Sequence, residues 1–196
     1  MSAVSEPRRR ADAERSRAAI LDAALALLPD QPGAGMSAIA AAAGVSRQTI
    51  YAHFPSRDDL RVAVADRLAA TTAAAMSDAD LTAGSPTAAL LRVLDISWRA
   101  FEANTPVMRN LGPVAPKDGY ARHIPVTDHL LPLLRRGLDS GEFTCATTPE
   151  WLATAIVSVG AAAKQEVKTG RMTRPEAEAA LRESVLRLAG APAPGT

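Results

Sequence analysis

Several polar side chains lie within a short, partly apolar stretch, residues 44–60, which reads GVSRQTIYAHFPSRDDL. Arg47 can bond bidentately to guanine in the major groove, and Gln48 can do the same to adenine. Hydroxyl and imidazole groups can donate to phosphates, as can backbone amides at a helix N-terminus. The pattern suits contact with DNA, and a solvated polar face on a structural helix pair is the plainer alternative. The candidate residues are Ser46, Arg47, Gln48, Thr49, Tyr51, His53 and Arg57.

Two short helices joined by a turn are predicted over residues 36–54. In the first helix, apolar residues recur at i, i+3, i+4 and i+7, which is the spacing of one helical face. Gly44 can adopt the left-handed conformation that turns the chain, and Ser46 is a favourable N-cap for the second helix. Ile50 and Phe54 are four residues apart and give this helix a buried side. This layout is a helix-turn-helix that presents the polar residues outward.

The composition favours helices throughout. Of the 196 residues, 47% are hydrophobic but only 4% are aromatic, so the core must be aliphatic and rich in alanine. Small side chains suit closely packed helices better than a β-sandwich. No strand pattern of useful length and no internal repeat is found. We expect an all-α protein of about nine helices, with an N-terminal three-helix helix-turn-helix domain joined to a C-terminal helical bundle.

Cysteine usage and hydropathy indicate the cellular setting. A single cysteine, Cys145, excludes an internal disulfide framework and suits a reducing compartment. The first residues contain no apolar segment, so no signal peptide is expected. The longest weakly polar run, residues 152–163, is too short to span a bilayer. We therefore expect a soluble, cytoplasmic protein with no membrane partner.

Breaks in periodicity divide the chain into four predicted segments. The N-terminal end holds a proline, three consecutive arginines and no periodicity, which indicates a disordered basic arm. No acidic residue lies between Asp30 and Asp58, so a small basic surface is possible near the helix-turn-helix. The segments are the arm (1–11), the helix-turn-helix domain (12–58), a C-terminal domain (59–190) and a disordered tail (191–196).

Prolines and capping residues set the expected helix ends. Pro106, after a threonine, is expected to start a separate short helix, the sixth. Pro132 is expected to kink or split a helix over residues 123–139. Residues 112–119 are expected to form a loop. Capping patterns are found at Ser56–Asp59, Thr148–Pro149 and Thr173–Glu176.

Residues 39–60 resemble the signature of TetR-family transcriptional regulators and read IAAAAGVSRQTIYAHFPSRDDL. That signature runs Ile-Ala, then Ala-Gly-Val-Ser, Thr-hydrophobic-Tyr, His-Phe, Ser-Lys/Arg, an acid and Leu. The resemblance in sequence is specific over about residues 12–68. Beyond them it extends only to the helical architecture. The matching residues are Ile39, Ala40, Ala43, Gly44, Val45, Ser46, Thr49, Ile50, Tyr51, His53, Phe54, Ser56, Arg57, Asp58 and Leu60.

The resemblance implies an all-helical dimer. Its N-terminal domain would bind a palindromic operator in double-stranded DNA, and its C-terminal domain, residues 59–190, would bind a small effector and dimerise. In the family, the residues equivalent to Arg47, Gln48 and Thr49 tend to contact bases or nearby phosphates. Those equivalent to Tyr51, His53 and Arg57 tend to contact the DNA backbone.

The sequence departs from the family pattern in three places. Gln48 stands where a small residue is common, which adds a candidate base contact. Gly35 stands where threonine is common, so one hydroxyl contact to phosphate is expected to be absent. Ala41 and Ala42 stand where charged residues are frequent. We infer that basic residues near the N-terminus compensate by reaching phosphates or the minor groove. They are Arg8, Arg9, Arg10, Arg15 and Arg17.

The eighth expected helix is nearly apolar all round over residues 152–163. Such a helix must be covered on more than one side, either by its own chain alone or partly by a symmetry mate. The resemblance favours the second alternative and implies a homodimer through the eighth and ninth helices. A two-fold dimer also suits a palindromic site with half-sites one DNA turn apart.

Candidate effector contacts come from large flexible or aromatic side chains, each of which is otherwise an ordinary core residue. Few charged residues fall within the apolar faces, which favours a small, mainly apolar effector. His123, Asp128 and His129 do not indicate a metal site, because adjacent helical residues point to different sides and no cysteine lies near. We expect no cofactor and no metal. The effector candidates are Trp98, Phe101, Met108 and Trp151.

Two other function classes fit a helical chain. An enzyme would need a nucleophile-base pair, a metal cluster or a phosphate loop, and no Gly-x-Ser-x-Gly, His-Glu-x-x-His or glycine-rich phosphate motif is present. We therefore assign no catalytic residues. An interaction module that has lost DNA binding is disfavoured by the intact residues 44–60. The sequence predicts a ligand-responsive, DNA-binding transcriptional regulator, most often a repressor.

Overall fold

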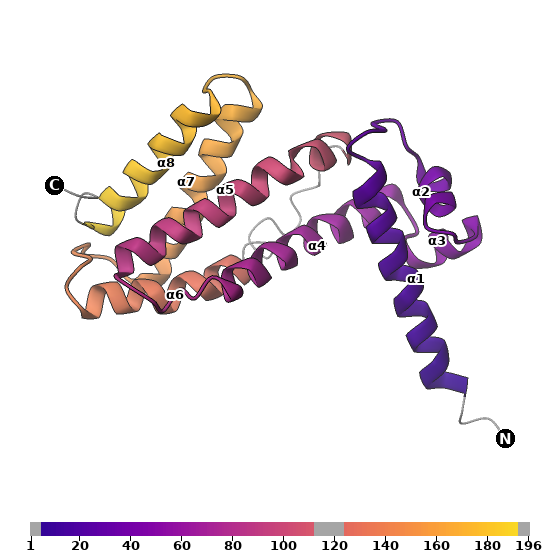
Figure 1. Ribbon diagram of the computed structural model, residues 1–196, viewed down its shortest axis with the longest axis horizontal. Helices are drawn as coiled ribbons and strands as arrows, with labels where there is room; N and C mark the ends of the chain where they lie inside the picture. The colour runs from indigo at the N-terminus through magenta and orange to yellow at the C-terminus, as the bar shows by residue number, and fades with distance from the viewer. Residues whose placement is uncertain (1–4, 112–123, 192–196) are drawn as a thin grey trace. The chain divides into compact units, whose positions relative to one another are not determined.

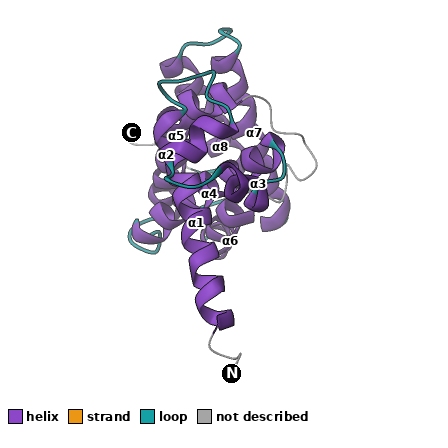
Figure 2. Ribbon diagram, turned by 90° about the vertical axis from the view of Figure 1, so that its right-hand side faces the viewer, coloured by secondary structure: helices purple, strands orange, loops and turns teal. Residues whose placement is uncertain are grey.

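The computed structural model describes residues 5–111 and 124–191, and the regular elements in these ranges are all helices (Figures 1 and 2). The all-α class is thereby confirmed. The described residues form eight helices, one fewer than the roughly nine expected. They are α1 (Ser5–Leu27), α2 (Met36–Ala42), α3 (Arg47–His53), α4 (Arg57–Asp78), α5 (Pro86–Leu111), α6 (Ile124–Asp139), α7 (Pro149–Lys168) and α8 (Arg174–Ala189).

The chain divides into two compact units, each with its own hydrophobic core. The N-terminal unit comprises Met1–Leu68 and Ala103–Asp118, and the C-terminal unit comprises Ala69–Glu102 and Gly119–Thr196. Both α4 and α5 contribute residues to each unit. The predicted domain boundary after residue 58 falls within α4, and the division of functions at that point stays a prediction.

The core of the N-terminal unit joins α1, α2 and α3 to the first turns of α4. Ile20, Ile39 and Leu60 are fully buried or nearly so, and each such side chain stabilises the fold by about 1.5–3 kcal/mol. The end of α5 also belongs to this unit, because the Nδ2 of Asn110 donates to the carbonyl oxygen of Leu28 at 2.6 Å. The helix-turn-helix therefore packs on an aliphatic core.

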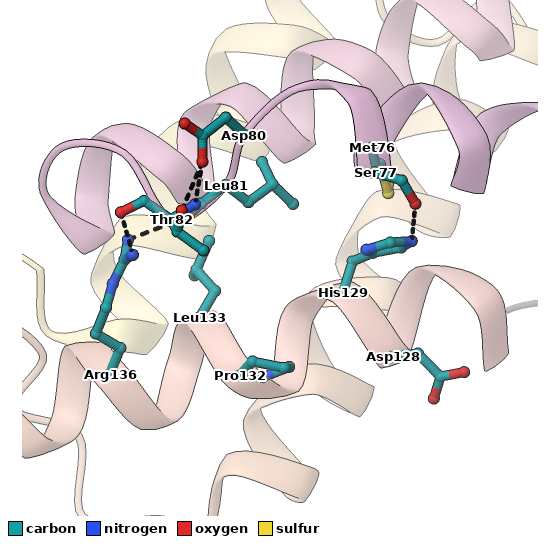
Figure 3. A pocket seen from close by; sticks show the side chains of 10 residues that line it. All are labelled: Met76, Ser77, Asp80, Leu81, Thr82, Asp128, His129, Pro132, Leu133 and Arg136. Atoms are coloured by element: carbon teal, nitrogen blue, oxygen red, sulfur yellow. Dashed lines mark hydrogen bonds between the residues drawn. The ribbon is translucent and has the colours of Figure 1, made fainter.

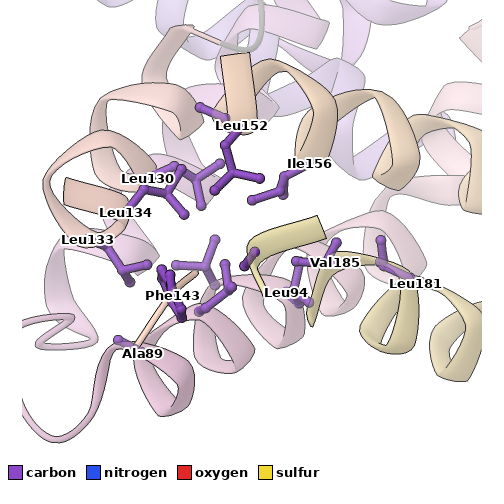
Figure 4. Packing of buried hydrophobic residues seen from close by; sticks show 14 of the residues in the cluster. Ala89, Leu94, Leu130, Leu133, Leu134, Phe143, Leu152, Ile156, Leu181 and Val185 are labelled. Atoms are coloured by element: carbon purple, nitrogen blue, oxygen red, sulfur yellow. The ribbon is translucent and has the colours of Figure 1, made fainter. Parts of the chain in front are cut away.

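The core of the C-terminal unit is formed by α5, α6, α7 and α8, with the end of α4 (Figure 4). α7 packs against both α6 and α8. Phe143, in the segment after α6, lies so close to Gly137 that a Cβ on the glycine would come within 2.1 Å of the ring. The amide of Phe143 also donates to the carbonyl oxygen of Gly137 at 2.9 Å. Position 137 therefore requires glycine, because the ring of Phe143 leaves no room for a Cβ atom there.

The expected disordered arm over residues 1–11 is wrong from residue 5 onward, because α1 begins at Ser5. Pro7 lies in the first turn of α1, where backbone amides have no carbonyl partner within the helix. Proline consequently costs no hydrogen bond there, and the arginines and alanines that follow favour helix. The predicted tail at 191–196 lies outside the described residues apart from Ala191.

Two predictions at prolines need correction. Pro106 does not start a separate helix, because α5 runs unbroken from Pro86 to Leu111 with Pro106 inside it. Of the two outcomes expected at Pro132, splitting is wrong, because α6 runs unbroken across it, and a kink stays a prediction. Buried residues anchor each helix on both sides of its proline, for example Trp98 and Val107 in α5. This packing outweighs the single backbone hydrogen bond that each proline removes. The expected loop over residues 112–119 lies outside the described residues.

The predicted helix caps are confirmed. Ser56 and Asp59 cap the start of α4 reciprocally, since each backbone amide donates to the other side chain at 2.9 and 3.1 Å. Thr173 and Glu176 form a complete capping box at α8, and Thr148 caps α7. Within residues 5–111 and 124–191, every helix is too short or too polar to cross a lipid bilayer.

Candidate nucleic-acid interface and effector region

The turn between α2 and α3 is closed by local hydrogen bonds. Gly44 has a left-handed φ of 67°, which glycine adopts without steric cost. Its amide donates to the carbonyl oxygen of Ala41 at 3.1 Å. Ser46 then caps α3, because its side chain accepts a hydrogen bond from the amide of Thr49 at 3.0 Å. The direction of α3 is therefore set within its first turn.

One side of α3 is anchored in the core of the N-terminal unit. Ile50 and Phe54, one turn apart, are both buried. The guanidinium of Arg17, on α1, lies 5.1 Å from the centroid of the Phe54 ring, a cation–π contact that ties α1 to the end of α3. Ring and aliphatic contacts thus fix the buried side, so the opposite side faces outward in a defined orientation.

The outward side of α3 carries polar groups able to bond to base edges and phosphates. Arg47 and Gln48 are exposed, and Tyr51, one turn further on, is 41% exposed. The hydroxyl of Thr49 lies 2.8 Å from that of Ser46, the capping residue. Because no acidic residue occurs between Asp30 and Asp58, α3 itself has no negative side chain to repel DNA.

The last two predicted DNA contacts are partly engaged within the protein. His53 is half-buried, with its ring centroid 6.3 Å from that of Phe54. The Nη1 of Arg57 donates to the carbonyl oxygen of Ala34 at 2.8 Å. Arg57 therefore holds the chain that enters α2, a role that its sequence position did not reveal.

The basic residues of α1 differ in their surroundings. Arg8, Arg9 and Arg10 are exposed on the first turns of the helix. Arg15 is bonded to Asp12, and Arg17 lies over the Phe54 ring. The inferred compensating contact with DNA consequently depends most on Arg8 and Arg9.

The four effector candidates do not come together. Trp98 is only 3% exposed, and its ring centroid lies 5.5 Å from that of Phe101. The Nε1 of Trp98 is buried and has no hydrogen-bond partner among the described residues. Trp151 is 55% exposed, and Met108 packs on the core of the N-terminal unit. Only Trp98 and Phe101 therefore form a pair.

A lysine lies next to this aromatic pair. The Nζ of Lys164, on α7, is 5.8 Å from the centroid of the Phe101 ring. Burial lowers the pKa of Lys164, because the charged ammonium loses solvation there. The aromatic face of Phe101 offsets part of that loss through a cation–π contact.

A pocket of about 480 Å³ lies elsewhere in the C-terminal unit, between the end of α4, the loop that follows it and α6 (Figure 3). None of the four effector candidates lines it. The Asp128 and His129 pair considered for metal does line it, yet no group of three or more potential metal ligands gathers in the described ranges. His123 lies outside them. The lining residues are Met76, Ser77, Asp80, Leu81, Thr82, Asp128, His129, Pro132, Leu133 and Arg136.

The helix-turn-helix segment matches a known family. Residues 20–64 match the model of bacterial regulatory proteins of the tetR family. The HTH-type transcriptional repressor LfrR of Mycolicibacterium smegmatis is 48% identical over 82 residues, which cover 42% of this chain and 43% of that protein. In sequence, the chain thus spans less than half the length of this curated relative.

A solved structure extends the likeness along the chain. The TetR-like transcriptional regulator LfrR from Mycobacterium smegmatis, in complex with proflavine, is 30% identical over 89% of this chain and 96% of that chain, with a TM-score of 0.56. The chain belongs to the TetR family. The reduced form of NemR from E. coli, at 18% identity over 91% of this chain and 100% of that chain, shares the fold with a TM-score of 0.65.

Membership of the TetR family makes the protein a transcriptional regulator with a DNA-binding helix-turn-helix, here α2 and α3.

Sequence reasoning identified this element but missed the pocket, whose walls come from segments some 50 positions apart. The apolar periodicity of α6 marks Leu133 as a core residue and gives no signal that its neighbours border a cavity. Pro132 within a helix is the local signal for this wall, since a proline can bend a helix around a cavity.

Proposed function

We propose that this TetR-family regulator is a homodimeric repressor that binds a palindromic operator and leaves it when a small, mainly apolar effector binds. The observation that carries the proposal is the outward side of α3, where Arg47, Gln48 and Tyr51 project from a helix whose other side is buried. We assign DNA binding to residues 12–58, and effector binding and dimerisation to residues 59–190.

Each group on this side suits a particular part of DNA. The guanidinium of Arg47 and the amide of Gln48 match the paired hydrogen-bonding atoms of guanine and adenine in the major groove. Thr49 approaches bases or nearby phosphates. The remaining groups contact phosphates, which position the protein without reading sequence. They are Ser46, Tyr51, His53 and Arg57.

The proposed dimer forms through α7 and α8. Trp151, Ser158 and Ala162 are exposed along one stripe of α7, and none of them is charged. A mostly apolar stripe with a large exposed aromatic ring is typical of a helix that a second copy covers. Replacing Trp151 with glutamate should shift the protein toward monomer in sedimentation velocity experiments, whereas an unchanged dimer would contradict this assignment.

The proposed effector is a small molecule taken up by the C-terminal unit. The related LfrR was solved with proflavine, and the C-terminal unit of this chain contains a pocket of about 480 Å³. Effector binding would favour a dimer state whose two recognition helices no longer match the half-site spacing. Titration of the operator complex with candidate effectors tests this step.

Selection of bound fragments from random DNA by the purified protein tests the whole proposal. We expect one enriched palindrome whose half-sites are about 10 base pairs apart, centre to centre, as for a two-fold dimer. An enriched but asymmetric site would contradict binding as a two-fold dimer. Absence of any enriched site would contradict the proposed operator binding itself.

A further inference from the structure

The pocket in the C-terminal unit has an apolar wall (Figure 3). Met76 on α4, Leu81 in the following loop and both Pro132 and Leu133 on α6 contribute to it. Its volume of about 480 Å³ falls in the range of roughly 300–1,000 Å³ that is usual for small-molecule sites. The pocket can therefore hold the body of a small apolar molecule.

The terminal nitrogens of Arg136 and the hydroxyl of Thr82 already donate within the protein, whereas the Nε of Arg136 is buried and has no hydrogen-bond partner among the described residues. The Nη1 of Arg136 donates to the carbonyl oxygen of Thr82 at 2.6 Å, and its Nη2 donates to that of Leu81 at 3.2 Å. The hydroxyl of Thr82 donates to Asp80 at 2.5 Å. A ligand that accepts from the terminal nitrogens of Arg136 or from the hydroxyl of Thr82 would have to displace these internal bonds.

The imidazole at the other end of the pocket presents an acceptor. The hydroxyl of Ser77 donates its single proton to the carbonyl oxygen of Ala73 at 3.2 Å. Its oxygen lies 3.4 Å from the Nε2 of His129 and can accept a proton from that nitrogen, depending on the tautomer of the ring. In the tautomer that carries its proton on Nε2, the Nδ1 is an acceptor. In the view of Figure 3 this nitrogen lies on the Leu81 side of the ring.

A second acceptor follows from the proline in α6. Pro132 has no N–H, so the carbonyl of Asp128, four residues earlier, lacks the donor that a regular helix would supply. Both residues line the pocket. The carboxylate of Asp128 is exposed and points away from the other lining residues in Figure 3.

The lining carries more negative than positive charge. It contains two carboxylates, Asp80 and Asp128, and one guanidinium, that of Arg136. Hydrogen bonds from Thr82 lower the pKa of Asp80, so this carboxylate stays ionised at neutral pH. A ligand that donates hydrogen bonds therefore meets favourable groups.

We propose that this pocket binds an apolar amine, whose N–H groups bond to the Nδ1 of His129 and the carbonyl oxygen of Asp128. The apolar body then lies against Leu81, Pro132 and Leu133. The inference deepens the proposed function, on which it rests, by naming the chemical class of the effector.

Calorimetry on the full chain without DNA tests this site. The probes are proflavine and acridine, which share three fused rings but differ in the two amino groups of proflavine. Proflavine should bind at least about 10-fold more tightly than acridine, because acridine lacks the amino groups that donate both hydrogen bonds. Equal affinities for the two compounds, or no binding of proflavine, would overturn the proposal.

Two variants test which groups of the protein contact the ligand. Pro132→Ala supplies the missing N–H to the Asp128 carbonyl, and His129→Phe removes the ring nitrogens. Each should weaken proflavine binding by about 3- to 10-fold and leave acridine binding within about 2-fold. Pro132→Ala keeps the test usable if His129→Phe does not fold, because alanine favours helix. Proflavine binding that both variants leave unchanged, or that Trp98→Phe alone removes, would overturn the assignment.

DNA binding is measured separately by mobility shift. If the protein binds its selected operator but the two variants leave proflavine affinity unchanged, only the amine site is wrong. If the amine binds as described but no DNA is bound, the proposed function is wrong and the site stands.

Discussion

The Nη1 of Arg57 donates to the carbonyl oxygen of Ala34 at 2.8 Å, across 23 positions of sequence. Ala34 directly precedes Gly35, the N-cap of α2, which makes no side-chain cap bond. The guanidinium therefore secures the entry to α2 where the helix lacks a capping side chain. Arg57 positions the helix-turn-helix in addition to any contact it makes with DNA.

Replacing Arg57 with alanine should lower the free energy of unfolding by about 1–3 kcal/mol, because the carbonyl of Ala34, a buried residue, loses a charged donor. Urea unfolding followed by circular dichroism measures this change. Arg57→Lys retains the charge and should recover most DNA binding but less of the stability. Full stability in Arg57→Ala would mean that the bond to Ala34 contributes nothing.

Arg47→Ala should weaken specific DNA binding by about 1–3 kcal/mol and relax the preference at one base pair. The exposed guanidinium has no part in the core, so folding should be unaffected. Repeating the random-DNA selection with the variant measures both effects. Gln48→Ala should relax a different base pair.

Tyr51→Phe is the matched control for the base-reading variants. It removes one hydroxyl from the same side of α3 and should weaken binding to all sequences alike, as expected for a phosphate contact. If Arg47→Ala also lowered affinity for all sequences alike, base reading by Arg47 would be wrong.

The first turns of α1 offer a test by salt dependence. Replacing Arg8 and Arg9 with alanine should reduce the slope of log K against log salt concentration by roughly 0.9 for each phosphate that the variant no longer neutralises. Fluorescence anisotropy at several salt concentrations provides the slope. Arg187→Ala, which removes an exposed arginine paired with Glu183 on α8, is the control and should leave the slope unchanged.

Gly137→Ala should destabilise the C-terminal unit by about 1–3 kcal/mol, because the new methyl group would overlap the buried ring of Phe143. Thermal unfolding measures the loss. Gly160→Ala is the matched control, since a methyl group at that position would meet no neighbouring atom within 4 Å. This helical substitution should instead stabilise the protein by about 0.5–1 kcal/mol. Equal effects at the two glycines would contradict the close approach at Phe143.

The capping box of α8 should make stability depend on pH. Hydrogen bonds from the side chain and backbone of Thr173 lower the pKa of Glu176 from 4.5. A carboxyl whose pKa is lower in the folded state stabilises the protein above its unfolded pKa, and this contribution is lost as pH falls through the folded value. Glu176→Gln should therefore be less stable than wild type at pH 7, and the difference should shrink on acidification. A difference that grows in acid would contradict this linkage.

Features that depend on residues three or four positions apart could be predicted from the sequence. The cap at Ser46, the reciprocal bonds of Ser56 and Asp59, and the left-handed Gly44 all belong to this class, because their partners lie within one turn. The helix-turn-helix was consequently predicted residue by residue.

Features that depend on distant contacts could not be predicted in the same way. The partner of Arg57 lies 23 positions away, and the pocket joins α4 to α6. The prediction at Pro106 is wrong because local rules place proline in the first turn of a helix, whereas burial on both sides keeps α5 continuous. Tertiary packing decides such cases, and a single sequence does not display it.

The two tryptophans of the chain lie at opposite extremes, with Trp98 3% exposed and Trp151 55% exposed. Indole fluorescence depends on contact with water, so the protein carries two intrinsic optical probes of different character. An aqueous quencher such as iodide should reach Trp151 and spare Trp98. Covering α7 with a second copy would then protect the accessible emission, so association could be followed on unlabelled protein while Trp98 continues to report the core.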